Sequence, residues 1–208
     1  MIFLIFTSCI HNTRGGRVDY EARKQRYITC INIAVEILKD YPQIKPIIVE
    51  NSGLSESYLD ELNCDVVYTN NNSVDTKEKK GMNEMLDIQY VIEKYNIQDD
   101  DFVIKLTGRY RMRDNTFLEK VINSINEYDI FMRFYNVCTR KKTKFDCVLG
   151  YFAVKSKYLK GFKYKGKRSA EIEFAGHIRN NINEEKICDV DDLRIECCFA
   201  EGNRIQKV

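Results

Sequence analysis

Two short segments of this sequence are apolar at nearly every position, and they constrain the fold more than any other feature. Ile2 to Thr7 is apolar on both faces, and Phe102 to Leu106 is a second such run, interrupted only by Lys105. Strands that are apolar on both faces are typical of parallel sheets covered by helices. The sequence therefore predicts an α/β fold with these two strands at its centre.

The rest of the chain alternates between helix and strand patterns. The predicted helices, from apolar residues at steps of three and four, are 27–38, 55–62, 81–95, 116–125 and 169–183. The further predicted strands are 45–50, 65–68, 129–134 and 147–154, followed by a hairpin of 187–190 and 193–199. Thr116 and Glu119 match a capping box, and 155–168 is predicted to be a basic loop. This order indicates a mixed, mainly parallel sheet flanked by helices, with an antiparallel C-terminal part.

The composition fits a single domain that spans residues 1–208. The chain has 44% hydrophobic and 31% charged residues and a formal net charge of +2, so the total charge implies no polyanion partner. The eight cysteines form no Cys-x-x-Cys pair and only two histidines are present, so we expect reduced, mostly buried thiols and no zinc site. No apolar run approaches the ~20 residues of a membrane span, so we expect a soluble, cytoplasmic protein.

The segment after the second apolar run contains a candidate anion site. Thr107 and Gly108 end the predicted strand, and glycine lets the backbone come close to a ligand. The arginines that follow alternate, Arg109, Arg111 and Arg113, and would face one side if the chain stays extended. Arginine binds phosphate oxygens in a fork, and ligands of open α/β sheets bind at the carboxyl ends of strands. The segment predicts a phosphate or nucleotide-sugar site; the alternative is a turn with solvated arginines.

Other strand and helix ends offer weaker signals. Asn51 follows the strand that ends at Glu50, where a side chain can bind a base or ribose or only cap the turn. Lys79 and Lys80 precede Gly81 at a helix start that can attract a diphosphate, or they lie in a solvated loop. Dinucleotide, P-loop and Gly-x-Ser-x-Gly motifs are absent, which disfavours nicotinamide or flavin enzymes, P-loop ATPases and serine hydrolases.

The last predicted helix carries candidates for a general base. Glu171 and Glu173 lie at its start, and Glu173 is four residues from His177 and hence its neighbour on the helix surface. One of these carboxylates is a candidate to deprotonate an acceptor hydroxyl, and the alternative is an ordinary surface pair. Asp191 and Asp192, in the predicted hairpin, are reserve candidates.

Taken together, these segments resemble the small glycosyltransferases of the GT-A fold, especially those of large DNA viruses and bacterial surface-polysaccharide clusters. The resemblance covers most of the chain and follows the order of the family's patterns. It includes the acidic helix after Val154 and rests on the segments Ile2-Phe-Leu-Ile-Phe-Thr-Ser8, Val49-Glu50-Asn51-Ser52-Gly53, Lys80-Gly81, Lys105-Leu-Thr-Gly-Arg-Tyr110 and Gly150-Tyr-Phe-Ala-Val154.

The resemblance implies transfer of a sugar from a nucleotide-diphosphate donor to a hydroxyl acceptor, a glycan or glycoprotein, and no nucleic-acid partner. It implies a nucleotide over strands one, two and four. Thr7, Ser8 and Asn51 would lie near the base and ribose, and Lys80 near the diphosphate. We expect single displacement with inversion, because no covalent nucleophile is identified.

The family's metal motif, Asp-x-Asp, normally ends the central strand, where this chain has Thr107-Gly108-Arg109. Two literal copies, at 99–101 and 189–191, lie elsewhere in the predicted fold, so no metal ligands are predicted. We expect Arg109, with Arg111 and Lys80, to neutralise the leaving diphosphate in place of Mg²⁺ or Mn²⁺. The alternatives are a nucleotidyltransferase that makes sugar nucleotides, which needs a glycine-rich phosphate loop, and a non-catalytic module that binds nucleotides or nucleic acid.

Overall fold

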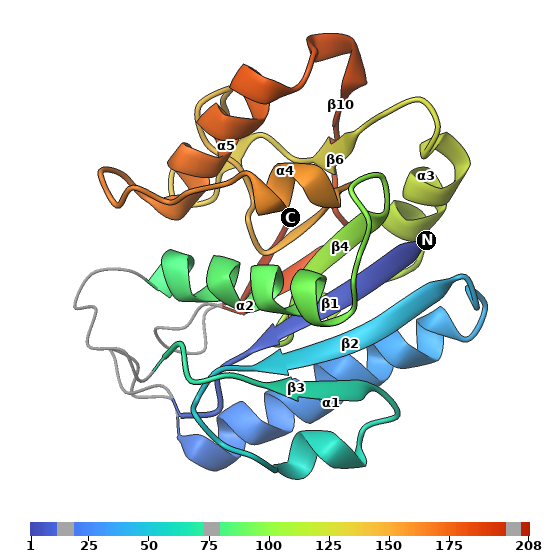
Figure 1. Ribbon diagram of the computed structural model, residues 1–208, viewed down its shortest axis with the longest axis vertical. Helices are drawn as coiled ribbons and strands as arrows, with labels where there is room; N and C mark the ends of the chain where they lie inside the picture. Colours follow the sequence, from blue (N-terminus) through green and yellow to red (C-terminus); the bar gives the residue numbers. More distant parts are fainter. Residues whose placement is uncertain (12–18, 73–79, 199–204) are drawn as a thin grey trace.

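A central sheet runs through the protein, with helices on both of its faces (Figure 1). The computed structural model describes residues 1–11, 19–72, 80–198 and 205–208, without the side chain of Lys80. The strands of the sheet are β1 (Ile2–Ser8), β2 (Ile44–Glu50), β3 (Asp65–Tyr68), β4 (Phe102–Thr107), β6 (Ile130–Met132), β9 (Tyr151–Lys155) and β10 (Ile187–Asp189). Among the described residues these seven strands follow the order β10-β6-β9-β4-β1-β2-β3.

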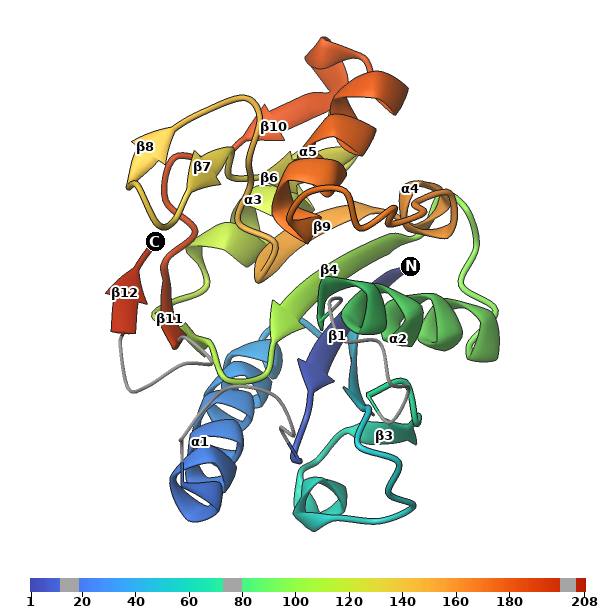
Figure 2. The same cartoon turned by 90° about the vertical axis from the view of Figure 1, so that its left-hand side faces the viewer.

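The strands end together at one edge of the sheet. β1 pairs in parallel with both β2 and β4, β2 with β3, and β6 with β10. β9 alone in this sheet is antiparallel, to β4 and to β6, so it begins where its neighbours end. The carboxyl edge, which faces the viewer in Figure 2, therefore gathers the ends of β1, β2 and β4 side by side. The predicted mixed, mainly parallel sheet is confirmed.

The helices in the described residues form two layers. They are α1 (Tyr20–Leu38), α2 (Lys80–Lys94), α3 (Thr116–Ser124), α4 (Ser156–Lys160) and α5 (Ala170–Asn181), with 3₁₀ turns η1 (Tyr58–Glu61) and η2 (Glu184–Lys186). Buried residues of α1 and α3 form one core cluster, and those of α2, α4 and α5 form the other. None of the described helices is long and apolar enough to cross a membrane.

Both faces of β1 are covered, because successive side chains of a strand point to opposite sides. Ile2, Leu4 and Phe6 pack with α1 and α3, whereas Phe3 and Ile5 pack with α2, α4 and α5. Burying an aliphatic or aromatic side chain of this size contributes about 1.5–3 kcal/mol. The continuous apolar run therefore fixes β1 between two helical layers.

Helix α1 shows how the sequence positions one of these layers. The carboxylate of Asp19 accepts a hydrogen bond from the amide of Ala22 and caps the helix. Tyr27, Ile31 and Leu38 are buried at helical spacing on the side that faces the sheet. The amino end of α1 thereby comes to lie beside the loop that leaves β1.

A second, smaller sheet confirms the antiparallel C-terminal part but not the predicted hairpin. In the described residues it contains β12 (Ile205–Lys207), β11 (Ile195–Cys198) and β5 (Arg111–Met112), paired antiparallel. β10 and β11 belong to different sheets, so the hairpin of 187–190 with 193–199 is wrong. The amide of Val190 extends the parallel pairing by donating to the carbonyl of Met132. Apolar alternation predicted the strands here, but it does not specify their partners.

Three local predictions also change. β9 begins at Tyr151 rather than at 147, because a turn at 149–150 precedes it, and the predicted basic loop contains α4. Helix α3 has Asn115 at its N-cap without a side-chain bond, so the capping box is wrong. Asp114 instead accepts from the amide of Thr116, and Glu119 accepts from Asn115. A two-stranded ribbon, β7 (Tyr135–Asn136) with β8 (Lys141–Lys142), precedes β9.

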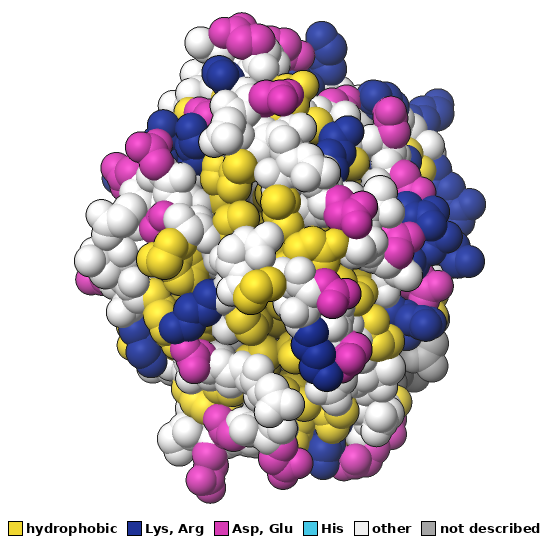
Figure 3. Space-filling view, turned by 90° about the vertical axis from the view of Figure 1, so that its right-hand side faces the viewer, with side chains coloured by type: hydrophobic (Ala, Val, Ile, Leu, Met, Phe, Trp, Pro, Cys, Tyr) yellow, Lys and Arg dark blue, Asp and Glu magenta, His cyan; other side chains and the backbone are white. Residues whose placement is uncertain are grey.

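The amino ends of the strands lie at the opposite edge, which Figure 3 shows as a surface. Apolar side chains run down the middle of this face, and Lys and Arg side chains gather along one margin. No predicted site residue was assigned to this edge. The candidate functional residues lie around the carboxyl edge.

Candidate functional site

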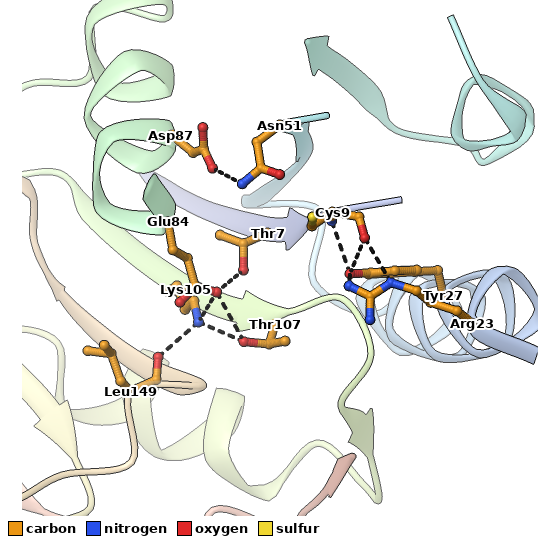
Figure 4. A network of polar contacts seen from close by, with 10 residues as sticks. All are labelled: Thr7, Cys9, Arg23, Tyr27, Asn51, Glu84, Asp87, Lys105, Thr107 and Leu149. Carbon is orange, nitrogen blue, oxygen red and sulfur yellow. Dashed lines mark hydrogen bonds and ion pairs between the residues drawn. The ribbon is translucent and has the colours of Figure 1, made fainter. Parts of the chain in front are cut away.

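Helix α2 places two carboxylates over the ends of the central strands. Glu84 and Asp87 are three residues apart and therefore lie on the same side of the helix. Glu84 reaches the ends of β1 and β4, and Asp87 reaches Asn51 after β2 (Figure 4). These two acids organise the carboxyl edge.

The middle of β4 carries a fully buried lysine. Lys105 is 0% exposed, and its ammonium lies 2.8 Å from Glu84 Oε1, 2.7 Å from Thr107 Oγ1 and 2.9 Å from the carbonyl of Leu149. Three acceptors match the three N–H groups of an ammonium. Burial lowers the pKa of Lys105, an effect that Glu84 opposes. Lys105 is thus fully engaged by the protein and joins β4, α2 and the turn before β9.

Glu84 is held through one of its two oxygens. Oε1 accepts the hydroxyl of Thr7 at 2.5 Å as well as Lys105. Burial acts to raise the pKa of Glu84, but Lys105 and Thr7 hold it below its ordinary value. The Glu84 side chain is 26% exposed, and among the described residues Oε2 has no hydrogen-bond donor. The site therefore contains an ionised carboxylate with one oxygen in use and one open.

Asp87 is buried among neutral donors. Oδ2 accepts from Asn51 Nδ2, and Oδ1 accepts from Thr69 Oγ1 and Asn71 Nδ2, each at 2.7 Å. Burial raises the pKa of Asp87 to about 6, although these three hydrogen bonds act in the opposite direction. Because Asn51 turns its amide nitrogen toward Asp87, its Oδ1 points away and is buried, with no hydrogen-bond partner among the described residues. An unpaired buried acceptor costs about 1–3 kcal/mol, which a ligand donor would offset.

The first three residues of the loop after β1 have their backbone amides occupied. The amide of Cys9 donates to the hydroxyl of Tyr27 at 3.0 Å, that of Ile10 to Glu50 Oε1 at 2.8 Å, and that of His11 to Ser52 Oγ at 2.9 Å. Glu50 is 0% exposed and so ties this loop to the turn after β2. These three successive amides are directed at protein groups, not at a ligand position.

Two residues of α1 strengthen that loop. Arg23 donates from Nε to the carbonyl of Cys9 at 2.8 Å and from Nη2 to the Tyr27 hydroxyl at 3.3 Å (Figure 4).

Ser8, predicted to lie near the nucleotide, donates its hydroxyl to the carbonyl of Val49 at 2.9 Å. Ser8 is 3% exposed, so its described role is to join β1 to β2.

The predicted anion segment turns after β4. The amide of Tyr110 donates to the carbonyl of Thr107, so the chain does not stay extended. Arg111 and Arg113 are exposed, whereas Arg109 turns inward and donates from Nη1 to the carbonyl of Cys198 at 2.5 Å. Nε of Arg109 is buried and has no hydrogen-bond partner among the described residues. The three arginines do not form one cluster, and Arg109 is the one directed into the protein.

Gly108 permits a close approach, but to an aromatic ring. A Cβ at this position would lie 3.0 Å from Cδ1 of Tyr27 and 3.3 Å from the carbonyl oxygen of Thr7. The Gly108 amide donates to that same carbonyl at 2.9 Å. The glycine therefore lets the turn after β4 pack on α1 and holds Arg109 beside the end of β1.

The predicted catalytic carboxylates have different surroundings. Glu171, in the first turn of α5, is close enough to Lys105 to act on its pKa. Glu173 accepts the amides of Lys165 and Lys167, each at 2.6 Å, and so holds the loop before α5. These amides, with that of Arg168, keep the pKa of Glu173 below its ordinary value although burial acts to raise it. The catalytic assignments of Glu171 and Glu173 stay predictions.

The other predicted residues lie farther along the chain. Asp191 has a side chain that is 90% exposed and pairs with Lys142 at 3.0 Å. Asp192 accepts from the amide of Arg194 at 2.8 Å. His177 contacts the carbonyl of Tyr158 at 2.9 Å. The side chain of Lys80 lies outside the described residues, although α2 begins at that position as predicted.

Sequence reasoning missed Glu84, Asp87 and the partners of Lys105. A lysine inside a buried strand needs a counter-charge, because an unpaired buried ammonium is very unfavourable. Glu84 and Asp87 interrupt the apolar side of the amphipathic α2, beside Ile88 and Val91, and are the acids that such a search would find. In the described part of the chain no group of three acidic, histidine or cysteine side chains is placed to hold a metal ion.

No protein-family model and no curated protein matches the sequence. Solved structures match the fold. A mannosyltransferase from Pyrobaculum calidifontis, in complex with GDP-Man and Mn²⁺, has a TM-score of 0.57 at 6% identity, over 97% of this chain and 56% of that chain. A protein assigned as a nucleotide-diphospho-sugar transferase from Desulfovibrio desulfuricans G20 has a TM-score of 0.51 at 9% identity, over 91% and 79%. The chain has the fold of nucleotide-diphospho-sugar transferases.

That fold serves more than one reaction. A CMP:2-keto-3-deoxy-manno-octonic acid synthetase complexed with CTP matches with a TM-score of 0.56 at 10% identity, over 100% of this chain and 92% of that chain. The predicted GT-A-like architecture is confirmed by these matches in fold. The reaction has to be argued from the residues of the carboxyl edge.

Proposed function

We propose that this protein is a glycosyltransferase that moves a sugar from a nucleotide-diphosphate donor to a hydroxyl acceptor. The observation that carries the proposal is a pair of complementary, unpartnered buried atoms beside the end of β1. Asn51 Oδ1 is an acceptor after β2, and Arg109 Nε is a donor after β4. A nucleotide laid across β1 offers N–H or O–H donors at its nucleoside and oxygen acceptors at its phosphates.

We assign the ends of β2 and β4 to different parts of the donor substrate. Asn51, oriented by Asp87, is assigned to the base or ribose, with Thr7 beside it. Arg109 is assigned to the diphosphate, next to Thr107, because a guanidinium forms strong charge-assisted bonds with phosphate oxygens. The amino end of α2 adds a favourable dipole for an anion.

For the general base we favour Glu171 over Glu173. Both oxygens of Glu173 accept hydrogen bonds from backbone amides, so substitution of Glu173 would destabilise the loop before α5. Glu171 lies at the start of α5, on the side of Lys105, and its carboxylate oxygens carry no such bonds in the described structure. Proton removal from an acceptor hydroxyl by Glu171, with inversion at the sugar, is the mechanism we propose.

The amides at the start of the loop after β1 do not supply the phosphate cradle that nucleotidyl transfer uses, and Gly15 and Gly16 lie outside the described residues. That reaction requires a loop that cradles a triphosphate, and backbone amides commonly supply such a cradle. Here the amides of Cys9, Ile10 and His11 donate to Tyr27, Glu50 and Ser52. The charged side chains near Thr107 are those of Lys105, Glu84 and Arg109. In the proposed reaction Arg109 balances the charge of the diphosphate, and no step is assigned to a metal.

Ligand-induced thermal stabilisation tests the proposal. The probes are UDP-glucose, UDP-galactose, UDP-N-acetylglucosamine, GDP-mannose and dTDP-glucose, with the matching nucleoside diphosphates. We expect a saturable rise in Tm with at least one donor, reduced by Asn51→Ala and Arg109→Met and unchanged by Asn180→Ala on the exposed surface of α5. Equal stabilisation of all three variants would contradict the assigned site.

A further inference from the structure

We propose that the open oxygen of Glu84 accepts a hydrogen bond from a hydroxyl of the transferred sugar, which makes Glu84 a specificity-determining residue. This inference rests on the proposed function and names the group that would recognise the sugar. None of the sequence motifs pointed to Glu84. Its carboxylate is held at one oxygen by Lys105 and Thr7.

The first step concerns the two oxygens of the carboxylate. Oε1 lies 2.8 Å from the ammonium of Lys105 and 2.5 Å from the hydroxyl of Thr7, so its bonding capacity is used. Oε2 has no donor among the described residues, and the side chain is 26% exposed while Lys105 is 0% exposed. In the Lys105–Glu84 ion pair, the ammonium is therefore fully buried and the Glu84 side chain is partly exposed.

The second step concerns rigidity. Lys105 is fixed by three acceptors on different elements, and Thr7 is fixed within β1. Residues of β1 and β4 thus hold Oε1 of Glu84 in place. This restricts the position of Oε2 as well. A carboxylate that is positioned before binding loses less entropy when it meets a ligand.

The third step concerns the class of ligand. A carboxylate accepts hydrogen bonds from hydroxyls and also binds cations. Lys105 already compensates the charge of Glu84, and Arg109 is close enough to act on the pKa of the same carboxylate. A second cation would be repelled by these two charges, whereas a neutral hydroxyl would not. The geometry favours a sugar hydroxyl.

The fourth step concerns which hydroxyl. Glu84 contacts Thr7 and Thr107 at the ends of β1 and β4, and the turn that carries Arg109 directly follows β4. In the proposed orientation the diphosphate lies beside Arg109, and the transferred sugar is the next group of the donor. In the covalent structure of the donor substrate, the hydroxyls of this sugar are the hydrogen-bond donors nearest to the diphosphate.

A matched pair of variants isolates the oxygen. Glu84→Gln alone would leave Lys105 as an unpaired buried charge and threaten the fold. We therefore compare Lys105→Met, which keeps the carboxylate, with Lys105→Met/Glu84→Gln, which differs from it by one amide group. Binding is measured by calorimetry without acceptor, with the five nucleotide sugars named above, their nucleoside diphosphates, and monodeoxy analogues of the sugar that binds.

We expect the double variant to bind the nucleotide sugar about tenfold more weakly than Lys105→Met, because a hydrogen bond to a charged group is lost. Affinity for the nucleoside diphosphate should agree within twofold. One deoxy analogue should bind more weakly than the parent sugar to Lys105→Met but not to the double variant. The proposal is overturned if both variants bind the sugar equally, or if both ligands weaken together. If the unmodified protein binds none of the nucleotides, the proposed function fails and this inference fails with it.

Discussion

Asp87 accepts a 2.7 Å hydrogen bond from Nδ2 of Asn51, and this bond leaves the buried Oδ1 of Asn51 facing away without a donor. In the proposed nucleotide site, this relationship links the protonation state of Asp87 to the atom that Asn51 would present to the ligand. An ionised carboxylate can only accept, so it fixes which end of the amide is presented to a ligand. The pair joins α2 to the end of β2, where the resemblance places the nucleoside.

The first prediction concerns pH. The pKa of Asp87 is raised to about 6 from an ordinary 3.8 because the group is buried. As pH falls through 6, Asp87 gains a proton; with the proton on Oδ2, Asp87 becomes a donor toward Asn51 and favours the reversed amide, whose nitrogen is turned toward the ligand. Affinity for a nucleotide sugar should therefore fall between pH 7 and pH 5 and be constant above pH 7.

Calorimetry across this range tests it, and Asp87→Asn is the control because its side chain does not titrate. A nucleotide sugar is the right probe, since a terminal phosphate itself titrates near a pKa of about 6. The variant should show a flat profile. An unchanged pH dependence in Asp87→Asn would assign the effect to another group.

The second prediction concerns the ion pair between Lys105 and Glu84. Glu84→Ala leaves a fully buried ammonium and should destabilise the protein by about 3–5 kcal/mol. Lys105→Met leaves a carboxylate that is partly open to water, so we expect a smaller loss, about 1–2 kcal/mol.

Urea unfolding measures both variants and the double variant Lys105→Met/Glu84→Ala. The double variant should be more stable than Glu84→Ala alone, because it no longer buries an unpaired charge. Additive losses would mean that the two groups do not interact in the folded protein.

The third prediction concerns helix packing at Gly81. A Cβ on Gly81 would come within 2.2 Å of Cβ of Ala170, at the start of α5. Overpacking of this kind costs about 1–3 kcal/mol, which outweighs the helix preference of alanine. Gly81→Ala should therefore lower the free energy of unfolding.

Gly176 provides the matched comparison, because a Cβ there meets no atom within 4 Å and the residue is exposed within α5. Gly176→Ala should raise the free energy of unfolding by about 0.5–1 kcal/mol. Chemical unfolding of the two variants in parallel checks both signs. A stabilised Gly81→Ala would show that α2 and α5 are farther apart than described.

The fourth prediction concerns the charge that balances the diphosphate. If Arg109 performs this task, donor affinity should be the same in chelator and in Mn²⁺ or Mg²⁺. Arg109→Met should weaken the nucleoside diphosphate and the nucleotide sugar alike, by about tenfold. Arg113→Met, at an exposed position beyond the turn, is the control and should bind normally. Binding that vanishes in chelator and returns only with metal would refute this role for Arg109.

The sequence predicted the fold well because burial patterns are local. The continuous apolar runs at 2–7 and 102–106 have to be buried on both faces of the sheet. In the structure α1 packs against one face and α2 against the other. The pairing of 187–190 was mistaken, because a short apolar strand can join any open edge. In this fold the edge beside β6 was available to it.

The site was harder to predict because its chemistry depends on contacts across the chain. Thr7, Asn51 and Arg109 were predicted from their places at strand ends, and their roles in binding stay predictions. Glu84 was missed, since its role appears only when Lys105, distant in sequence, is placed against it. Glu173 was favoured for its spacing from His177, but spacing does not reveal that backbone amides occupy its oxygens.

The proposed glycosyltransferase breaks the bond between the sugar and the nucleoside diphosphate. Mass spectrometry of the products tests it most directly, because donor hydrolysis by water is detectable without a known acceptor. Incubation with the stabilising nucleotide sugar should release a nucleoside diphosphate and free sugar, and Glu171→Gln should slow this release. Incubation with the nucleoside triphosphate and a sugar 1-phosphate should release no pyrophosphate. Pyrophosphate release, with no nucleoside diphosphate from any nucleotide sugar, would contradict the account and identify a nucleotidyltransferase.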